Sequence, residues 1–407
     1  MTAARGRAAV IFLVFAFTYF LSAALRAVTA TLAPVFSAEL GLRAADLGLL
    51  AGAYFLGFAC MQLPLGTALD RFGPRRTLLA LVSVAVLGCV AFALAPNVWA
   101  LIAARVLIGA GVAACLMAPL TLYRTLLSPA AQLRANSWML MTGSLGMLAS
   151  TLPVQALLPL LGWRGLFWLV AALLATGMVF IAALVPRDAP APGPAPAADP
   201  GYAAIARHPL FAAMAPLGFF MYGGMIAVQA LWAGPWLTRV ARQSAEQAAQ
   251  GLFVINLSML VAFLCWGTLM PRMVHKGIDA PTLMAWGLPL PLLLLAANVV
   301  LASEAGAVHW ALWCVSCTFV TLSQPAVGAA FPAEQAGRAL SAFNLVIFSG
   351  VFSIQWGIGL MVDALQGLGV TEVDAFRTAL GALCTCSVAS YVWFLRRRHG
   401  PVHEGYP

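Results

Sequence analysis

The sequence is dominated by long apolar segments, each close to the length that a helix needs to cross a bilayer. A spanning helix takes roughly 20 mostly apolar residues, and we predict twelve such segments between Ala8 and Leu395. Only 9% of the 407 residues are charged and 62% are hydrophobic, whereas a typical soluble domain is about 25% charged. The chain is therefore predicted to be an all-α integral membrane protein.

The predicted spans fall into two groups of six. They cover residues 9–36, 46–69, 77–95, 98–122, 135–160, 164–185, 209–238, 248–271, 281–302, 307–331, 338–363 and 373–395. Between the sixth and seventh lies "VPRDAPAPGPAPAADPGYAAIARHP", whose prolines favour an extended chain. We predict an N-terminal six-helix bundle (1–186), a cytoplasmic linker (187–208), a C-terminal six-helix bundle (209–396) and a cytoplasmic tail (397–407).

The basic residues are distributed as a membrane protein requires. The chain has a formal net charge of +9, which by itself would suggest a nucleic-acid partner. With the N-terminus inside, however, fifteen Lys and Arg residues fall on the cytoplasmic side and five on the external side. This asymmetry follows the positive-inside rule. It predicts both termini in the cytoplasm and no nucleic-acid partner.

The two groups of spans also share a sequence repeat. "GTALDRFGPRR" follows the second span, and "GTLMPRMVHKG" follows the eighth, 201 residues later. A repeat of half the chain length is typical of duplicated transporters, which bind substrate near the midplane between the halves. The repeat therefore favours a transporter over a receptor or an anchoring protein.

The first copy resembles the signature loop between helices 2 and 3 of the major facilitator superfamily. The matching residues are Gly66, Asp70, Arg71, Gly73, Arg75 and Arg76. The resemblance implies a twelve-span secondary transporter that works by rocker-switch alternating access. It also implies that these six residues form a cytoplasmic latch between the halves. The alternative is that the charges only anchor the loop in the cytoplasm. In the second copy Pro271 replaces the aspartate, which predicts a weak latch there.

A second motif lies in the fourth span. "RVLIGAGVAA", from Arg105 to Ala114, resembles a family element that is associated with proton coupling, and its glycines also permit close helix packing. The fifth span, "MTGSLGMLASTLP", lacks the Gly-Pro and paired glycines of the family's antiporters. This absence argues against a drug/proton antiporter.

Arg26 lies deep inside the otherwise apolar first span. It is three or four residues past the middle of the span, or roughly 5 Å from it. At 100° per residue, Thr18, Ser22, Arg26 and Thr29 fall within an arc of about 80°, so the helix carries one polar stripe. A charge in a membrane costs roughly 2.5–3.5 kcal/mol and normally faces a cavity or a partner. We therefore expect this stripe to face the transport pathway.

Polar side chains at a similar depth in other spans extend this predicted surface. They are Tyr54, Gln62, Asn136, Thr142, Gln155, Tyr222, Gln229, Asn256, Gln324, Asn344 and Gln355. Each of them has an alternative role as a hydrogen-bonding contact between helices. Four tryptophans are candidates for lining or gating the pathway, or for ordinary packing: Trp232, Trp236, Trp313 and Trp356.

A guanidinium near the midplane suits a carboxylate or a phosphate, because its planar fork donates two charge-assisted hydrogen bonds. An Arg eight residues before Pro34, followed by "DLG" (46–48), resembles the organophosphate and organic-anion branch of the family. The phosphate antiporters carry a second arginine in span 7, and "MYGGMIAVQALWAGPWL" has none. A monoanionic carboxylate is therefore the predicted substrate. The alternative is that Arg26 only binds neighbouring carbonyls or amides.

The coupling ion stays open at this point. None of the thirteen acidic residues lies at mid-membrane. The candidates for coupling are Arg105, Asp46 at an external helix end, and His309, because histidine as a residue type serves as a proton carrier. Exchange, facilitated uptake and proton symport all remain open.

Other classes of protein are less consistent with the sequence. There is no Gly-x-x-x-x-Gly-Lys-Ser/Thr loop for ATP and no clustering of His with acids for a hydrolytic metal. We therefore predict no enzyme and no cofactor. The alternatives are a copper importer with the soft ligands Met221, Met225, Met259 and Cys265, and a transporter-like sensor that moves nothing. The expected partners are the lipid bilayer and a small anion. We expect a monomer in a bacterial-type inner membrane.

Overall fold

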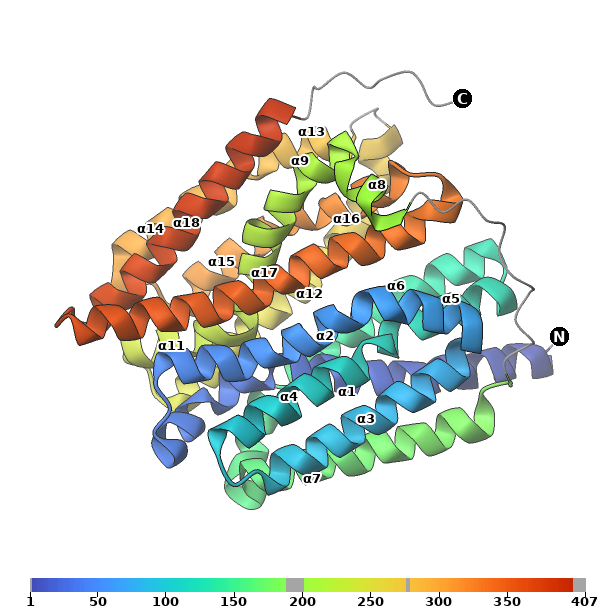
Figure 1. Cartoon of the computed structure of the whole chain (residues 1–407), viewed down its shortest axis with the longest axis horizontal. Helices are drawn as coiled ribbons and strands as arrows, with labels where there is room; N and C mark the ends of the chain where they lie inside the picture. The colour runs from blue at the N-terminus through green and yellow to red at the C-terminus, as the bar shows by residue number, and fades with distance from the viewer. Residues whose placement is uncertain (1, 188–200, 276–278, 398–407) are drawn as a thin grey trace.

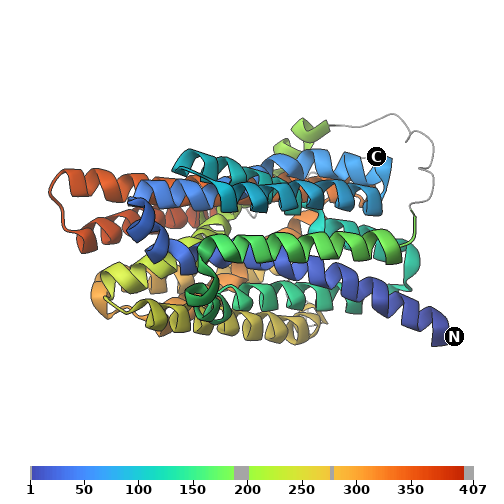
Figure 2. The same ribbon diagram turned by 90° about the horizontal axis from the view of Figure 1, so that it is seen from below.

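The computed structural model describes residues 2–187, 201–275 and 279–397, and these residues form helices without any strand. The first seven helices are α1 (Thr2–Leu40), α2 (Ala44–Phe72), α3 (Pro74–Leu94), α4 (Val98–Val112), α5 (Ala114–Leu126), α6 (Pro129–Ala149) and α7 (Leu152–Leu184). Their axes run along the length of the molecule, as both views show (Figures 1 and 2).

The remaining helices are more often interrupted. They are α8 (Gly201–Arg207), α9 (Pro209–Leu217), η1 (Gly218–Tyr222), α10 (Gly223–Ala227), η2 (Val228–Trp232), α11 (Ala233–Pro235), η3 (Trp236–Val240), α12 (Ala245–His275), α13 (Ala280–Gly287), α14 (Pro289–Leu301), η4 (Ala302–Glu304), α15 (Ala307–Cys317), η5 (Thr318–Leu322), α16 (Ser323–Ala329), α17 (Ala333–Gly367) and α18 (Glu372–Arg397). The segments η1, η2 and η3 are π-helical, whereas η4 and η5 are 3₁₀ turns.

Eleven helical segments of the described chain are long and apolar enough to cross a membrane. The predicted fifth span, 135–160, falls on α6 and the first turns of α7, which are separated at Ser150 and Thr151. Within α7, Gly162 has a φ of 63° and marks a kink between two helices. The predicted sixth span begins just after this kink. The structure thus confirms an all-helical membrane protein, and the number twelve stays a prediction.

Most of the predicted linker and almost all of the predicted tail lie outside the described residues. Within the linker the structure describes α8, a helix of seven residues. We use N-terminal half for residues 1–186 and C-terminal half for residues 209–396. Figure 1 shows α2, α3, α4 and α7 in the lower part of the molecule and α14, α17 and α18 in the upper part.

The glycines of the fourth span allow two helices to lie against their neighbours at backbone distance. A Cβ atom on Gly109 would overlap the carbonyl oxygen of Tyr54 in α2. A Cβ atom on Gly57 of α2 would in turn overlap the carbonyl oxygen of Val106 in α4. Only glycine permits this approach, which confirms the packing role of the motif and fixes Tyr54 relative to α4.

The two halves meet most closely where α2 begins and α17 ends, which the charge pattern predicts to be the external end. A Cβ atom on Gly48 would overlap the carbonyl oxygen of Gln355, and one on Gly359 would overlap that of Ala44. In Figure 1 the two helices diverge from here toward their other ends. We call these the predicted external end and the predicted cytoplasmic end.

Candidate substrate-binding site

Arg26 of α1 is surrounded by aromatic side chains from both halves. Its guanidinium carbon lies 5.6 Å from the centre of the Phe58 ring. It interacts electrostatically with Tyr54 and Tyr19 in the N-terminal half, and the Tyr54 hydroxyl donates to the carbonyl oxygen of Ser22 at 3.3 Å. It also interacts with Tyr222, which belongs to the C-terminal half. The arginine therefore lies at the interface between the halves.

The polar stripe on α1 has unfilled hydrogen-bonding capacity. Ser22 Oγ, Arg26 Nε and Thr29 Oγ1 are buried and make no hydrogen bond of standard geometry. Thr18, one turn earlier, donates to the carbonyl oxygen of Val14 at 3.1 Å and is satisfied. A buried polar group without a partner costs about 1–3 kcal/mol. Three such groups on one stripe are consistent with a polar ligand that would pair with them.

Arg26 has no carboxylate partner in the described chain. Ion pairs in the described chain join Arg164 to Glu39, Arg239 to Glu372 and Arg377 to Asp374. All three pairs lie near the ends of spans, at the predicted external end. The positive charge of Arg26 is therefore balanced only by aromatic rings and hydroxyl dipoles.

A chain of three polar side chains lies in the C-terminal half beside Arg26. The Tyr222 hydroxyl, from η1, donates to Gln324 Oε1 at 3.4 Å. Gln324 Nε2, from α16, donates to Asn344 Oδ1 of α17 at 2.6 Å. The sequence predicted all three as members of one surface, and the structure brings them into contact with one another.

Other predicted members are satisfied within the C-terminal half. Gln229 Nε2 donates to Asn256 Oδ1 at 3.0 Å, and Asn256 Nδ2 donates to the carbonyl oxygen of Leu252. Gln355 Nε2 donates to the carbonyl oxygen of Ala227 at 3.4 Å, while Gln355 Oε1 is buried without a partner. The bond between Gln229 and Asn256 joins η2 to α12, which is the alternative role named above for these polar residues.

The N-terminal half has further predicted members with local bonds. Gln62 is buried, and its Nε2 donates to the carbonyl oxygen of Phe58 one turn earlier. Thr142 donates to the carbonyl oxygen of Trp138. Asn136 Oδ1 is buried without a partner. Gln62 and Thr142 thus bond to the backbone of their own helices. Asn136 keeps an oxygen that is free to accept a hydrogen bond.

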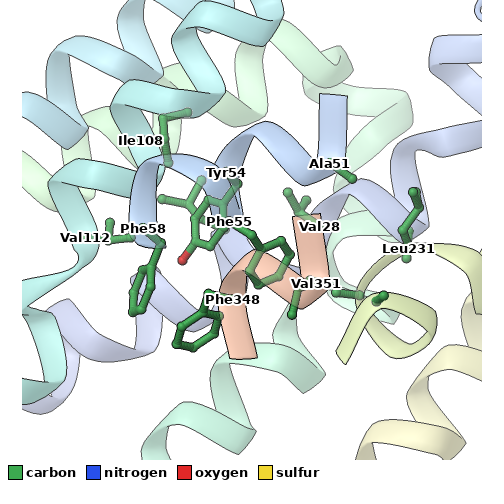
Figure 3. Close-up of a cluster of buried hydrophobic side chains, with 14 of the residues drawn as sticks. Val28, Ala51, Tyr54, Phe55, Phe58, Ile108, Val112, Leu231, Phe348 and Val351 are labelled. Carbon is green, nitrogen blue, oxygen red and sulfur yellow. The ribbon is translucent and has the colours of Figure 1, made fainter. Parts of the chain in front are cut away.

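An apolar cluster occupies the interface next to these polar groups. Figure 3 shows Phe55 and Phe58 of α2 facing Phe348 and Val351 of α17, with the Tyr54 ring between Phe55 and Phe58. The centres of the Phe58 and Phe348 rings are 4.5 Å apart, with an edge-to-face geometry. Val28 of α1 lies in the same cluster. Aromatic pairs of this kind stabilise a contact by about 0.5–1.5 kcal/mol beyond area burial, so the cluster holds the halves together beside Arg26.

The four candidate tryptophans pack rather than line an open surface. Trp232 Nε1 donates to the carbonyl oxygen of Gln355 at 3.1 Å, and Trp236 Nε1 donates to that of Ala305 at 2.9 Å. Trp313 is buried against Trp310. Trp356 packs near Phe352.

The coupling candidates have local structural partners. Arg105 is buried, and its Nη1 donates to the carbonyl oxygen of Leu25 at 3.0 Å, the residue before Arg26. Asp46 accepts a hydrogen bond from the backbone nitrogen of Arg43 and so caps the start of α2. His309 lies half-buried in the first turn of α15. Arg105 thus ties α4 to α1 directly beside the candidate site.

The signature loop lies at the end of α2 and the start of α3. Gly73 has a φ of 81° and connects the two helices. Arg75 Nη2 donates to the carbonyl oxygen of Ala182 near the end of α7 at 2.5 Å. Asp70 is exposed in the last turn of α2. In this conformation Arg75 joins the loop to α7, and the role of the loop as a latch stays a prediction.

Contacts between the halves at the predicted external end were not anticipated from the sequence. The Asp363 carboxylate of α17 accepts from the backbone nitrogens of Ala44 at 3.1 Å and Ala45 at 3.0 Å, at the start of α2. Arg239 Nη2 donates to Ser37 Oγ at 2.6 Å. The sequence offers one signal for the first contact. The N-cap residue of α2 is an arginine whose side chain makes no cap bond, so the helix obtains a cap from elsewhere.

The candidate soft-metal ligands differ in their surroundings. Met221 lies in one apolar cluster, and Met225 and Met259 lie in another. Cys265 is exposed. The described residues also contain no cluster of three His, Cys, Asp or Glu side chains suited to a metal ion. The copper alternative with these four sulfur ligands stays a prediction.

Comparison with known proteins identifies the family. The sequence matches the model of the Major Facilitator Superfamily over residues 15–355. No curated protein sequence matches the chain. Similar solved structures include a bacterial homologue of the human lysosomal transporter Spinster in an inward-facing, occupied conformation (TM-score 0.74, 18% identity, 98% of each chain).

A D-xylose-proton symporter is also similar (TM-score 0.72, 16% identity, 95% of this chain and 97% of that chain). So is the nucleoside transporter NupG (TM-score 0.76, 13% identity, 95% and 99%). At these identities the likeness concerns the fold alone. The family match covers most of the sequence and agrees with the signature loop and the helical architecture. The chain belongs to the major facilitator superfamily, and it is a membrane transporter.

Proposed function

We propose that this transporter carries a small organic anion, a monocarboxylate, with Arg26 as the anchor for the carboxylate. The observation that carries the proposal is the stripe of Ser22, Arg26 and Thr29, which presents three buried polar atoms without partners. A carboxylate would accept from the guanidinium fork and from one of the two hydroxyls, which lie about 10 Å apart along the helix. Charge-assisted hydrogen bonds of this kind are about twice as strong as neutral ones.

A single charge on the substrate follows from the charges near the site. Arg105 already donates to the carbonyl oxygen of Leu25 and lies between the rings of Tyr54 and Phe92, at 5.6 and 5.9 Å from their centres. Arg105 Nε is also buried without a partner, but its Nη1 bond holds that guanidinium against the backbone of α1, so we assign the carboxylate to Arg26. One guanidinium matches one carboxylate and leaves a doubly charged phosphate ester half-neutralised.

Transport would follow from rigid-body rocking of the halves, which is one of the established modes of switching. The site lies at their interface, with Arg26 in one half and Tyr222 in the other. The contacts at the predicted external end close that side, so the described conformation corresponds to a site that faces the cytoplasm. We place the protein in a bacterial-type cytoplasmic membrane as a monomer, and protons remain a candidate coupling ion.

The anchor is tested with Arg26→Gln and Arg26→Lys, with Arg164→Gln as a matched control. Arg164 is also an arginine, but it pairs with Glu39 at a span end. Benzoate and its neutral isostere benzamide serve as probes, and their dissociation constants are measured on purified protein in detergent.

We expect benzoate to bind and benzamide to bind far more weakly. Loss of a hydrogen-bonded charge costs about 1.5–3 kcal/mol, so Arg26→Gln should weaken benzoate binding about 10–150-fold. Arg26→Lys keeps the charge but loses the planar fork, so its benzoate affinity should lie between those of the unmodified protein and Arg26→Gln. Unchanged benzoate affinity in Arg26→Gln, or equal affinities for benzoate and benzamide in the unmodified protein, would remove the arginine from the site.

A further inference from the structure

We propose that the substrate also carries a hydroxyl group, remote from its carboxylate, that donates to Tyr222. The predicted class is a monocarboxylate with an apolar, ring-sized body and a hydroxyl at the far end. The inference rests on the proposed function, because it takes Arg26 as the carboxylate anchor. It adds a second recognition point, in the other half of the protein.

The direction of the hydrogen bonds defines what Tyr222 offers. Its proton is directed to Gln324 Oε1, and Gln324 is itself held by its donation to Asn344. The oxygen lone pairs of Tyr222 are left as acceptors. Tyr222 packs against the apolar cluster that contains Phe58, and the Arg26 guanidinium lies over the Phe58 ring, so we place this acceptor beside the candidate site. A ligand group that complements it must be a donor, such as a hydroxyl.

The chain of amides strengthens the acceptor. A hydroxyl that donates to one group becomes a better acceptor for the next, because hydrogen bonds in a chain polarise one another. Asn344 is buried, with 6% of its surface exposed, so the far end of the chain is shielded from water. These three side chains form a built acceptor rather than an isolated tyrosine.

The surface beside the two polar groups is apolar. Phe55, Phe58 and Phe348 lie together there, and Val28 and Val351 complete the cluster (Figure 3). A polar middle section of a substrate would lose its hydration against these rings without compensation. The body of the substrate is therefore predicted to be apolar, and an aromatic ring matches the shape of the neighbouring phenylalanines.

Two recognition points in different halves link binding to conformational change. A ligand that bonds to Arg26 in α1 and to Tyr222 in η1 gains both contacts only when the halves are close at this level. Such a ligand favours the closed arrangement by its differential affinity for it. A carboxylate without the hydroxyl would bind to one half only and would favour closure less.

The test uses two carboxylates that differ by one hydroxyl, 3-(4-hydroxyphenyl)propionate and 3-phenylpropionate. Their dissociation constants are measured by calorimetry on the purified full chain, on Tyr222→Phe, and on Tyr123→Phe as a control. Tyr123 is a buried tyrosine of α5 that packs against Phe12 and Phe15. Tyr123→Phe therefore also removes one buried tyrosine hydroxyl, but away from the proposed acceptor.

In the unmodified protein and in Tyr123→Phe we expect the hydroxylated probe to bind about tenfold more tightly, the value of one net hydrogen bond in a dry site. In Tyr222→Phe the two probes should bind equally. Equal affinities in the unmodified protein, or an unchanged ratio in Tyr222→Phe, would overturn the hydroxyl proposal and leave the carboxylate anchor standing. Failure of both probes to bind would overturn both proposals.

Discussion

Asp363→Asn is predicted to loosen the contact between the halves at the predicted external end of the transporter. In the structure the Asp363 carboxylate of α17 caps α2, a helix of the other half, through bonds of 3.1 and 3.0 Å to the nitrogens of Ala44 and Ala45. Asparagine keeps one acceptor oxygen and replaces the other with a donor that opposes an N–H group. It also removes the negative charge from the positive end of the helix dipole.

The size of the effect follows from these losses. A hydrogen bond to a charged group contributes about 1.5–3 kcal/mol, and the charge at the helix end adds about 0.3–1 kcal/mol at a partly exposed position. Side-chain rearrangement and water will offset part of this, so we expect a net loss of about 2 kcal/mol. A difference of this size shifts an equilibrium about 30-fold toward the state in which the external ends are apart.

The assay is a distance distribution between spin labels at Asn97 and Leu368, two exposed residues in loops of different halves at the predicted external end. The labels are attached to introduced cysteines after the eight native cysteines have been replaced. We expect Asp363→Asn to add or enlarge a population with a longer distance.

Asp46→Asn is the matched control. Asp46 also accepts a backbone hydrogen bond at the start of α2, but its partner is Arg43 in the same half. This variant should weaken the same helix end without moving the halves apart. An unchanged distribution in Asp363→Asn, or the same shift in both variants, would refute the reasoning.

Two further predictions concern the scaffold. Gly109→Ala should lower the melting temperature in detergent by the equivalent of about 3 kcal/mol, because a Cβ atom there overlaps the backbone of Tyr54. Gly337 has open space around it, so Gly337→Ala should leave the melting temperature unchanged. Equal melting temperatures for the two variants would contradict the packing argument. Burial lowers the pKa of His208, just before α9, so folding favours its neutral form: the stability it contributes is present above its unfolded pKa of about 6.5 and is lost as the pH falls. Melting temperatures at pH 7.5 and 5.5 should show a larger acid-side drop in the unmodified protein than in His208→Gln, and equal drops would count against this reasoning.

The membrane helices could be predicted because bilayer thickness imposes a length on apolar segments. The predicted second span, 46–69, lies within α2, and the predicted third, 77–95, matches α3 to within three residues. The breaks inside spans could not be predicted. The separation of α6 from α7 and the π-helical segments depend on which neighbouring helix each turn packs against, and a single sequence does not state that.

The candidate site shows the same division. Helical periodicity placed Ser22, Arg26 and Thr29 on one face, since that requires only 100° per residue. Whether a buried amide faces a substrate or another amide depends on the neighbouring helix, so the pairing of Gln229 with Asn256 was not foreseen. The contact of Asp363 with α2 joins a side chain to a backbone about 320 positions away, and residue types alone carry almost no information about such a partner.

The predicted seventh span, 209–238, differs from the other spans of the described chain because it contains three π-helical segments, η1, η2 and η3. A π turn takes up one residue more than an α turn while its backbone groups remain hydrogen-bonded. Converting one such turn to α-helix therefore rotates the residues on one side by about 100° relative to those on the other. Tyr222 lies in the first segment and Gln229 in the second. The span that carries Tyr222 can therefore rotate this side chain relative to the rest of the span by converting a π turn to an α turn, and its backbone hydrogen bonds are kept.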